Sequence, residues 1–73
     1  MVTLISAPIG SAVTIAKIDA EDTVKRRLKD LGIIAGQSVT PIYGTMGSTV
    51  LRVKDSRLAI NNGLARKIYV HRH

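Results

Sequence analysis

Residues 23–32 read TVKRRLKDLG, and this stretch decides how the rest of the chain is interpreted. Val24, Leu28 and Leu31 recur at i, i+4 and i+7, which is the spacing of one apolar stripe along an α-helix. Gly32 follows the last apolar position, where a helix usually ends on a left-handed residue. The stretch therefore predicts a helix over 23–31 that packs through its three apolar side chains.

The start and the length of this helix add two constraints. Asp22 or Thr23 can cap its first turn, and the carboxylate of Asp22 also suits the positive end of a helix. Nine residues make a helix only about 14 Å long, which is too short to persist alone. The rest of the chain must therefore supply the surface on which it packs.

The segments on both sides of the helix have patterns that are typical of strands, and after the helix the apolar residues alternate in twos. Residues 11–18 are rich in β-branched side chains and predict the first strand. In the strand expected over 39–43, Val39, Pro41 and Tyr43 point to one face. Because Pro41 has no N–H to donate, this strand should lie at a sheet edge or turn the proline nitrogen outward.

The second half of the chain predicts further short strands separated by tight turns. Leu51 and Val53 are expected to face inward from a strand over 49–54, with Arg52 and Lys54 in water. The other expected segments are a loop over 44–48, a turn at Asp55-Ser56, a return strand over 58–60, a turn over 61–63, one helical turn over 64–67 and a closing strand over 68–70.

Together these segments define the expected fold class. It is mainly β, with about five short antiparallel strands and one short α-helix between the first two. A sheet of this size protects its edges best by curling into a small SH3-like β-barrel. The 73 residues allow one domain, and the absence of Cys excludes stabilising disulfides. A single domain over 1–73 that depends on its apolar core is therefore expected.

The formal net charge of +6 is unevenly distributed. Residues 1–36 hold five basic and four acidic side chains, whereas residues 37–73 hold six basic side chains and Asp55. Such a bias favours acidic proteins, nucleic acid or an anionic membrane surface as partners, and it also serves solubility.

Membrane and targeting signals are weak in this chain. No run of 18 apolar residues occurs, so no segment is expected to insert into a bilayer. The first ten residues have no positively charged beginning and are interrupted by Pro8 and Gly10, which argues against a signal peptide.

Catalytic and metal-binding patterns are sparse. The sequence has no Cys, no Gly-x-Ser-x-Gly elbow and no P-loop, so neither an enzyme activity nor a cofactor is expected. His71 and His73 form an H-x-H pair that could begin a metal site, but no further ligands stand nearby. Asp19, Glu21 and Asp22 are interpreted as charge at the start of the helix. No metal site is therefore expected.

A basic small β-barrel that binds nucleic acid or the ribosome is an alternative function. Such sites combine basic side chains with aromatic rings on which bases stack. Tyr43 and Tyr69 are the aromatic residues of this chain, and both lie in strand patterns where core packing is commoner. The basic run at 25–27 is interpreted as a solvated helix face. The leading interpretation therefore expects no nucleic acid partner.

The motifs follow one another in a characteristic order. Residues 26–36 read RRLKDLGIIAG, preceded by Leu4, Pro8 and Gly10 and followed at the end by ARKIYV over 65–70. This order resembles the FeoA family, whose most specific stretch is a helix ending in Arg-Arg-Leu-x-x-Leu/Met-Gly-Ile-x-x-Gly and whose closing pattern is Ala-x-x-Ile-x-Val. The resemblance covers nearly the whole chain.

The resemblance implies a small cytoplasmic accessory protein of ferrous iron uptake, without catalysis or a cofactor of its own. Its implied partner is the cytosolic GTPase part of a FeoB-type ferrous iron transporter, whose state it would modulate. That partner would recruit the chain to the inner face of the membrane, and a weak homo-oligomer is compatible with this role.

For contact with the partner we expect exposed charge and the grooves beside it. The candidate residues are Lys25, Arg26 and Lys29 on the helix, together with Met46 at a loop tip. The chain departs from the family where residues 47–49 read GST, since the family often carries Gly-Asp-Pro there. It also lacks the Glu that often precedes Ala65.

Overall fold

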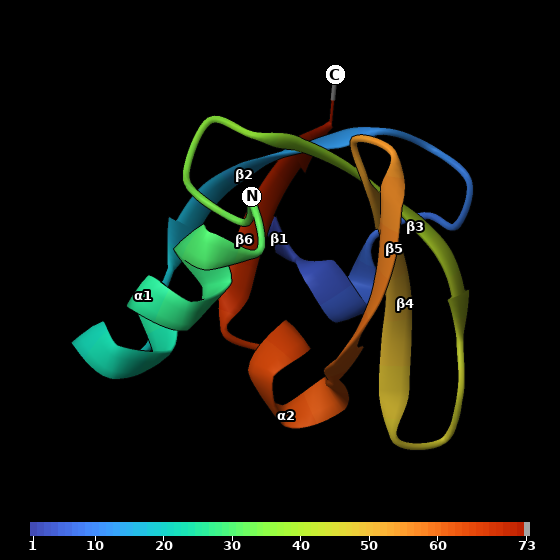
Figure 1. The fold of residues 1–73 in the computed structure, drawn as a ribbon. Coiled ribbons are helices and arrows are strands. Elements are labelled where there is room, and N and C mark those ends of the chain that lie inside the picture. The colour runs from blue at the N-terminus through green and yellow to red at the C-terminus, as the bar shows by residue number, and fades with distance from the viewer. Residues whose placement is uncertain (73) are drawn as a thin grey trace.

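Six short strands and two short α-helices lie along residues 1–72, the part of the chain that the computed structural model describes (Figure 1). His73, and with it the predicted H-x-H pair as a unit, lies outside the described residues. The elements are β1 (Val2–Thr3), the 3-10 turn η1 (Leu4–Ser6), β2 (Val13–Ile18), α1 (Asp22–Asp30), β3 (Ser38–Gly44), β4 (Ser48–Val53), β5 (Ser56–Asn61), α2 (Asn62–Ala65) and β6 (Ile68–Arg72).

The strands form one antiparallel sheet in the order β1-β6-β2-β3-β4-β5. The sheet bends strongly, and α2 contacts η1 as well as β4 and β5, so α2 and η1 occupy the gap between the two end strands (Figure 1). The predicted mainly β, SH3-like architecture is confirmed, with the sheet open between β1 and β5.

One strand was missed by the sequence patterns. β1 pairs with β6 through Val2 opposite Val70 and Thr3 opposite Tyr69, which makes six strands where about five were expected. A strand of two residues is too short to display an alternation of period two. It is defined by its pairing with β6, which lies at the other end of the chain.

The apolar side chains of the sheet and of α1 meet in one core. Leu51 and Val53 point inward from β4 while Arg52 and Lys54 are exposed, as predicted. The buried hydrophobic residues are Leu4, Ala7, Val13, Ile15, Leu28, Ile33, Val39, Leu51, Val53, Ile60, Ala65, Ile68 and Val70.

Helix α1 is confirmed, but its start and its packing differ in detail. It begins at Asp22, with Glu21 in the capping position and no side-chain cap, so the predicted capping by Asp22 or Thr23 is wrong. Leu28 is 3% exposed and packs in the core, whereas Leu31 is 49% exposed. The prediction that Leu31 fills the core is therefore also wrong.

The reason lies in how the helix ends. Gly32 has a φ of +88°, its N–H bonds to the carbonyl of Lys29, and the N–H of Ile33 bonds to the carbonyl of Leu28 at 2.8 Å. This pair of bonds is a Schellman motif, which reverses the chain and brings the residue after the glycine back onto the helix. Ile33 consequently occupies the core in place of Leu31.

Strand β3 lies between β2 and β4 in the sheet, so the expectation that Pro41 marks an edge strand is wrong. The alternative expectation was that the nitrogen of Pro41 faces outward. It fits the structure, because β2 pairs with β3 only at Ser38 and Val39 and leaves Pro41 without a partner strand on that side. The carbonyl of Pro41 accepts a bond of 2.7 Å from the N–H of Gly10, away from β4. In an extended strand the nitrogen of the same residue points to that side too, where no ladder bond is needed.

Tyr43 is 51% exposed, although the alternation of β3 predicted it on the same face as Pro41. The register between β3 and β4 shifts between Pro41 and Tyr43. Such a β-bulge inserts one residue into a strand and reverses the faces of the residues that follow. Tyr43 consequently lies on the solvent face, opposite Val50 of β4.

Two turns of the second half lie elsewhere than predicted. Val53 pairs with Ser56, so the tight turn is formed by Lys54 and Asp55, and Lys54 has a φ of +56°. The segment at 61–63, predicted as a turn, instead starts α2. The side chain of Asn61 accepts a hydrogen bond of 2.8 Å from the N–H of Leu64 and so caps this helix.

Candidate functional site

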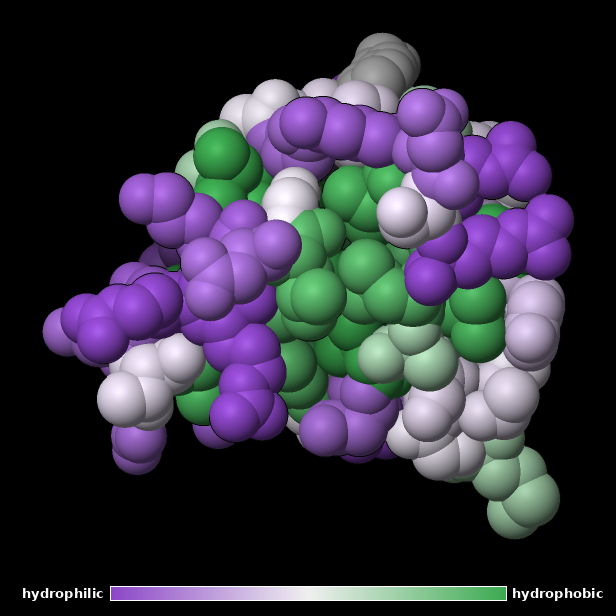
Figure 2. All heavy atoms as spheres, viewed as in Figure 1, coloured by the Kyte–Doolittle hydropathy of each residue, from purple (hydrophilic) through white to green (hydrophobic). Residues whose placement is uncertain are grey.

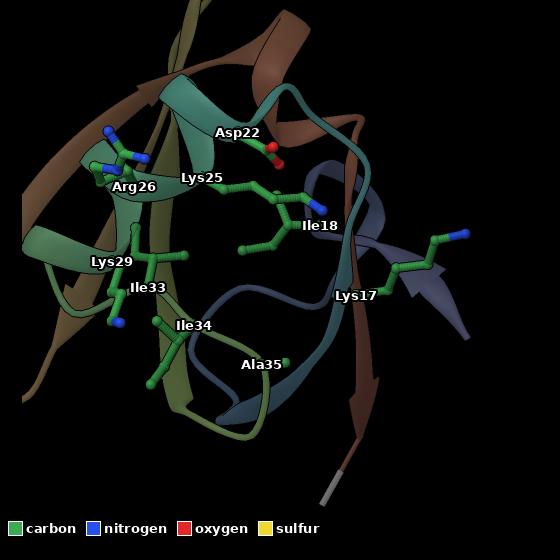
Figure 3. Close-up of a pocket in the computed structure, with 9 residues that line it drawn as sticks. All are labelled: Lys17, Ile18, Asp22, Lys25, Arg26, Lys29, Ile33, Ile34 and Ala35. Carbon is green, nitrogen blue, oxygen red and sulfur yellow. The ribbon is translucent and has the colours of Figure 1, made fainter.

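A groove of about 470 Å³ lies between α1, the end of β2 and the loop that joins α1 to β3 (Figure 3). It combines an apolar floor with a charged rim. Its lining residues are Lys17, Ile18, Asp22, Lys25, Arg26, Lys29, Ile33, Ile34 and Ala35.

The floor of the groove is built by segments that are distant in the sequence. Ile18 is the last residue of β2, and Ile33 is the first residue beyond the left-handed turn at Gly32. Figure 3 shows these two isoleucines pointing toward one another across the hollow. Ile34 is 43% exposed and Ala35 is exposed, so the floor offers apolar surface to a ligand.

The rim of the groove is predominantly positive. Lys25, Arg26 and Lys29 of α1 are exposed and surround the floor, and Asp22 is the one acidic residue of the lining. Lys17 also belongs to the lining, but Figure 3 shows its side chain pointing away from the hollow. Its ammonium lies 5.9 Å from the ring centre of Tyr69, a cation–π contact on the neighbouring strand.

The structure brings together three of the four residues predicted for partner contact. Lys25, Arg26 and Lys29 share the groove, whereas Met46 lies in the loop between β3 and β4. That loop and α1 are on opposite sides of the molecule in Figure 1. Met46 therefore belongs to a different surface.

The apolar part of the groove was missed by reasoning from the sequence. Ile18 ends a predicted strand and Ile34 follows the helix, and no local pattern shows that these two segments meet. The exposed cations were found because their position on a short amphipathic helix already places them in solvent.

Other kinds of site find little support in the described part of the chain. Within residues 1–72, no group of three or more His, Cys, Asp or Glu side chains is placed so that it could hold a metal ion. Within the same residues, no helix is long and apolar enough to cross a membrane.

Comparison with known proteins finds a family and a relative that match almost the full length of the chain. The family model for the FeoA domain matches residues 2–72. The Fe(2+) transport protein A of Methanocaldococcus jannaschii is 37% identical over 70 residues, which cover 96% of this chain and 85% of that protein.

Solved structures share the fold at lower sequence identity. The solution structure of the FeoA protein from Chlorobium tepidum aligns with a TM-score of 0.88 at 24% identity, covering 96% of this chain and 69% of that one. The zinc-complexed FeoA of Stenotrophomonas maltophilia, described as an SH3 domain protein, aligns with a TM-score of 0.76 at 22% identity, covering 96% and 89%.

The open, six-stranded sheet defines the class of protein, a small SH3-like domain. The family match and the relative from Methanocaldococcus jannaschii specify it further. The chain belongs to the FeoA family, whose members are accessory proteins of ferrous iron transport.

Proposed function

We propose that this chain is a regulatory accessory protein of ferrous iron uptake that docks on the cytosolic part of a FeoB-type transporter and modulates it. It acts by binding and not by catalysis. The observation that carries the proposal is the groove beside α1, where three cations surround an apolar floor. Membership of the FeoA family supplies the context of iron transport.

The chemistry of the groove specifies what it would bind. Ile18, Ile34 and Ala35 offer an apolar floor backed by the buried Ile33, so the ligand should insert an apolar side chain. The exposed cations of the rim favour carboxylates on either side of that anchor. A partner segment with one apolar side chain flanked by Asp or Glu fits this arrangement.

Docking changes a transporter only if the docked chain binds one of its states better than another. A rigid groove on a small domain can do so when the partner segment is accessible in one state alone. Because the rim charges are exposed, added salt screens them and should weaken docking. The apolar floor should keep part of the affinity at high salt.

The test is recovery of the transporter from solubilised membranes by the tagged chain. The triple variant Lys25→Gln, Arg26→Gln, Lys29→Gln should recover much less transporter than the natural chain. The control is Arg66→Gln, Lys67→Gln, Arg72→Gln, which removes three charges from exposed positions outside the groove. Equal recovery by all three proteins, or equal loss in both variants, would refute docking through the groove.

A further inference from the structure

A second surface lies on the outward side of β3, β4 and β5, away from the groove. The strand pairing places Thr40, Arg52 and Arg57 in one row and Tyr43, Val50 and Ala59 in the next row toward the β3–β4 loop. We call these two rows the hairpin face. Its side chains are all neutral or basic, and none of them lines the groove.

The first row holds two arginines in direct opposition. Arg52 of β4 pairs with Arg57 of β5, and both side chains are exposed. Like charges directly opposite each other on neighbouring strands destabilise a sheet. An anion bound between the two guanidinium groups would relieve this repulsion, and the planar guanidinium matches the oxygens of a phosphate especially well.

The second row is apolar and aromatic. The bulge in β3 turns Tyr43 outward, where it is half exposed beside the partly buried Val50. The two rows are about 7 Å apart along β4, which is the rise of two strand residues. A tyrosine with one apolar side and one polar end is typical of the boundary between lipid tails and water.

Beyond the second row stands the loop over 45–47, which carries Met46. The side chain of Met46 is fully exposed, although methionine is an apolar residue. The loop has a defined shape, because the hydroxyl of Thr45 accepts a bond of 3.0 Å from the N–H of Ser48 and the side chain of Asn62 donates to the carbonyl of Met46 at 3.3 Å. In Figure 2 the end of the hairpin that carries this loop projects from the body of the molecule.

From the tip of the hairpin the surface therefore changes from an apolar side chain to an aromatic row and then to paired arginines. The same order of chemistry runs from the interior of a bilayer through its interface to its phosphate groups. We propose that the hairpin face and the Met46 loop bind the surface of an anionic lipid bilayer. Met46 enters the interface, Tyr43 lies at its boundary, and Arg52 and Arg57 contact lipid phosphates.

This contact goes beyond the sequence-based expectation that the chain reaches the membrane only through a protein partner. It uses other residues than the groove, so either proposal can fail without the other. Four side chains, two of them charged, give weak binding alone. Combined with docking on a membrane protein, a weak second contact raises the total affinity through effective concentration.

The first test is co-sedimentation of the purified chain with vesicles of phosphatidylcholine, with and without phosphatidylglycerol. We expect binding to the anionic vesicles that falls as salt is added. Arg52→Gln, Arg57→Gln should lower the partition coefficient roughly tenfold or more, since each surface charge contributes substantially at such a membrane. The control Arg66→Gln, Lys67→Gln removes the same charge elsewhere and should lower it clearly less.

The second test uses the absence of Trp from the chain. Met46→Trp introduces a single reporter at the loop tip, and its emission should shift to the blue when anionic vesicles are added. Leu31→Trp places the reporter at the exposed end of α1 and should show no shift.

Three results would overturn the proposal. They are equal shifts from both reporters, equal losses in both charge variants, and salt-sensitive binding to single-stranded RNA with none to anionic vesicles. The last result would assign the hairpin face to nucleic acid. Circular dichroism of each variant confirms that the fold is retained.

Discussion

Leu31 lies at the surface although helical spacing places it on the apolar stripe, and Ile33 fills the core together with Leu28. The helical spacing predicts Leu31 as the next residue of the apolar stripe. The helix ends at Asp30, however, so Leu31 does not follow the helical path that would point its side chain into the core. The Schellman turn at Gly32 then delivers Ile33 to the core, where it is completely buried. A sequence pattern gives the period of a helix correctly, yet the side chain at its last position depends on where the chain leaves the axis.

Truncation of Leu28 and of Leu31 should reveal the difference in their burial. Leu28→Ala should lower the free energy of unfolding by about 2–5 kcal/mol, because it leaves a cavity in the core. Leu31→Ala should cost less than about 1 kcal/mol, since the side chain is half exposed. Urea denaturation of both variants measures the difference. Equal costs would show that Leu31 packs in the core after all.

Alanine substitutions at two glycines with left-handed backbone distinguish the cost of backbone strain from the cost of steric crowding. Gly32→Ala and Gly36→Ala both place a Cβ at a φ near +90°, which should cost about 1–2 kcal/mol each. At Gly32 the new atom would also lie 3.2 Å from a methyl group of Val53, whereas nothing lies within 4 Å at Gly36. Thermal unfolding should therefore show a larger loss for Gly32→Ala. A larger loss at Gly36 would contradict the described end of α1.

At the scale of elements, five of the six strands were predictable and their registers were not. β-Branched side chains identified β2 and alternation of apolar residues identified β3, β4, β5 and β6, because each strand carries its pattern by itself. The bulge that turns Tyr43 outward arises between β3 and β4, and a pattern read along one strand contains no information about its partner. For the same reason the opposition of Arg52 and Arg57 became visible only with the pairing of β4 and β5.

This opposition makes a prediction about the stability of the β4–β5 hairpin. Arg57→Glu should raise the free energy of unfolding by about 0.2–1 kcal/mol, because it replaces a repulsive cross-strand pair with an attractive one. Arg57→Gln should give a smaller gain, since it only removes the repulsion. Thermal unfolding at low salt measures both. A charge-reversal variant less stable than the natural chain would contradict the described register.

At the scale of the whole molecule, the site was predictable in part. Lys25, Arg26 and Lys29 were identified because a short amphipathic helix fixes which of its residues face solvent. Ile18 and Ile34 were not, because the groove exists only when the end of β2 and the loop after α1 are brought together by the sheet. Met46 was identified as exposed, but only the fold shows that it lies apart from the helix (Figure 1).

The composition of the groove also predicts how the docking affinity divides between charged and apolar contacts. Ile34→Ser should weaken docking by roughly tenfold, since it removes about 1.5 kcal/mol of apolar contact from the floor. It should leave the salt dependence unchanged, because no charge is altered. Titration of the transporter's cytosolic domain at several salt concentrations measures both quantities. Unchanged affinity would remove the apolar floor from the proposed site.

The most direct test of the central claim is an NMR titration of the isotope-labelled chain with the isolated cytosolic domain of the transporter. If the groove docks on that domain, the amide signals that shift or broaden should belong to residues 17–18, 22–29 and 33–35. Signals of the loop over 45–47 should stay in place, because that loop lies on the other side of the molecule. Signal changes confined to that loop, or no signal changes at a saturating concentration of the cytosolic domain, would contradict docking through the groove.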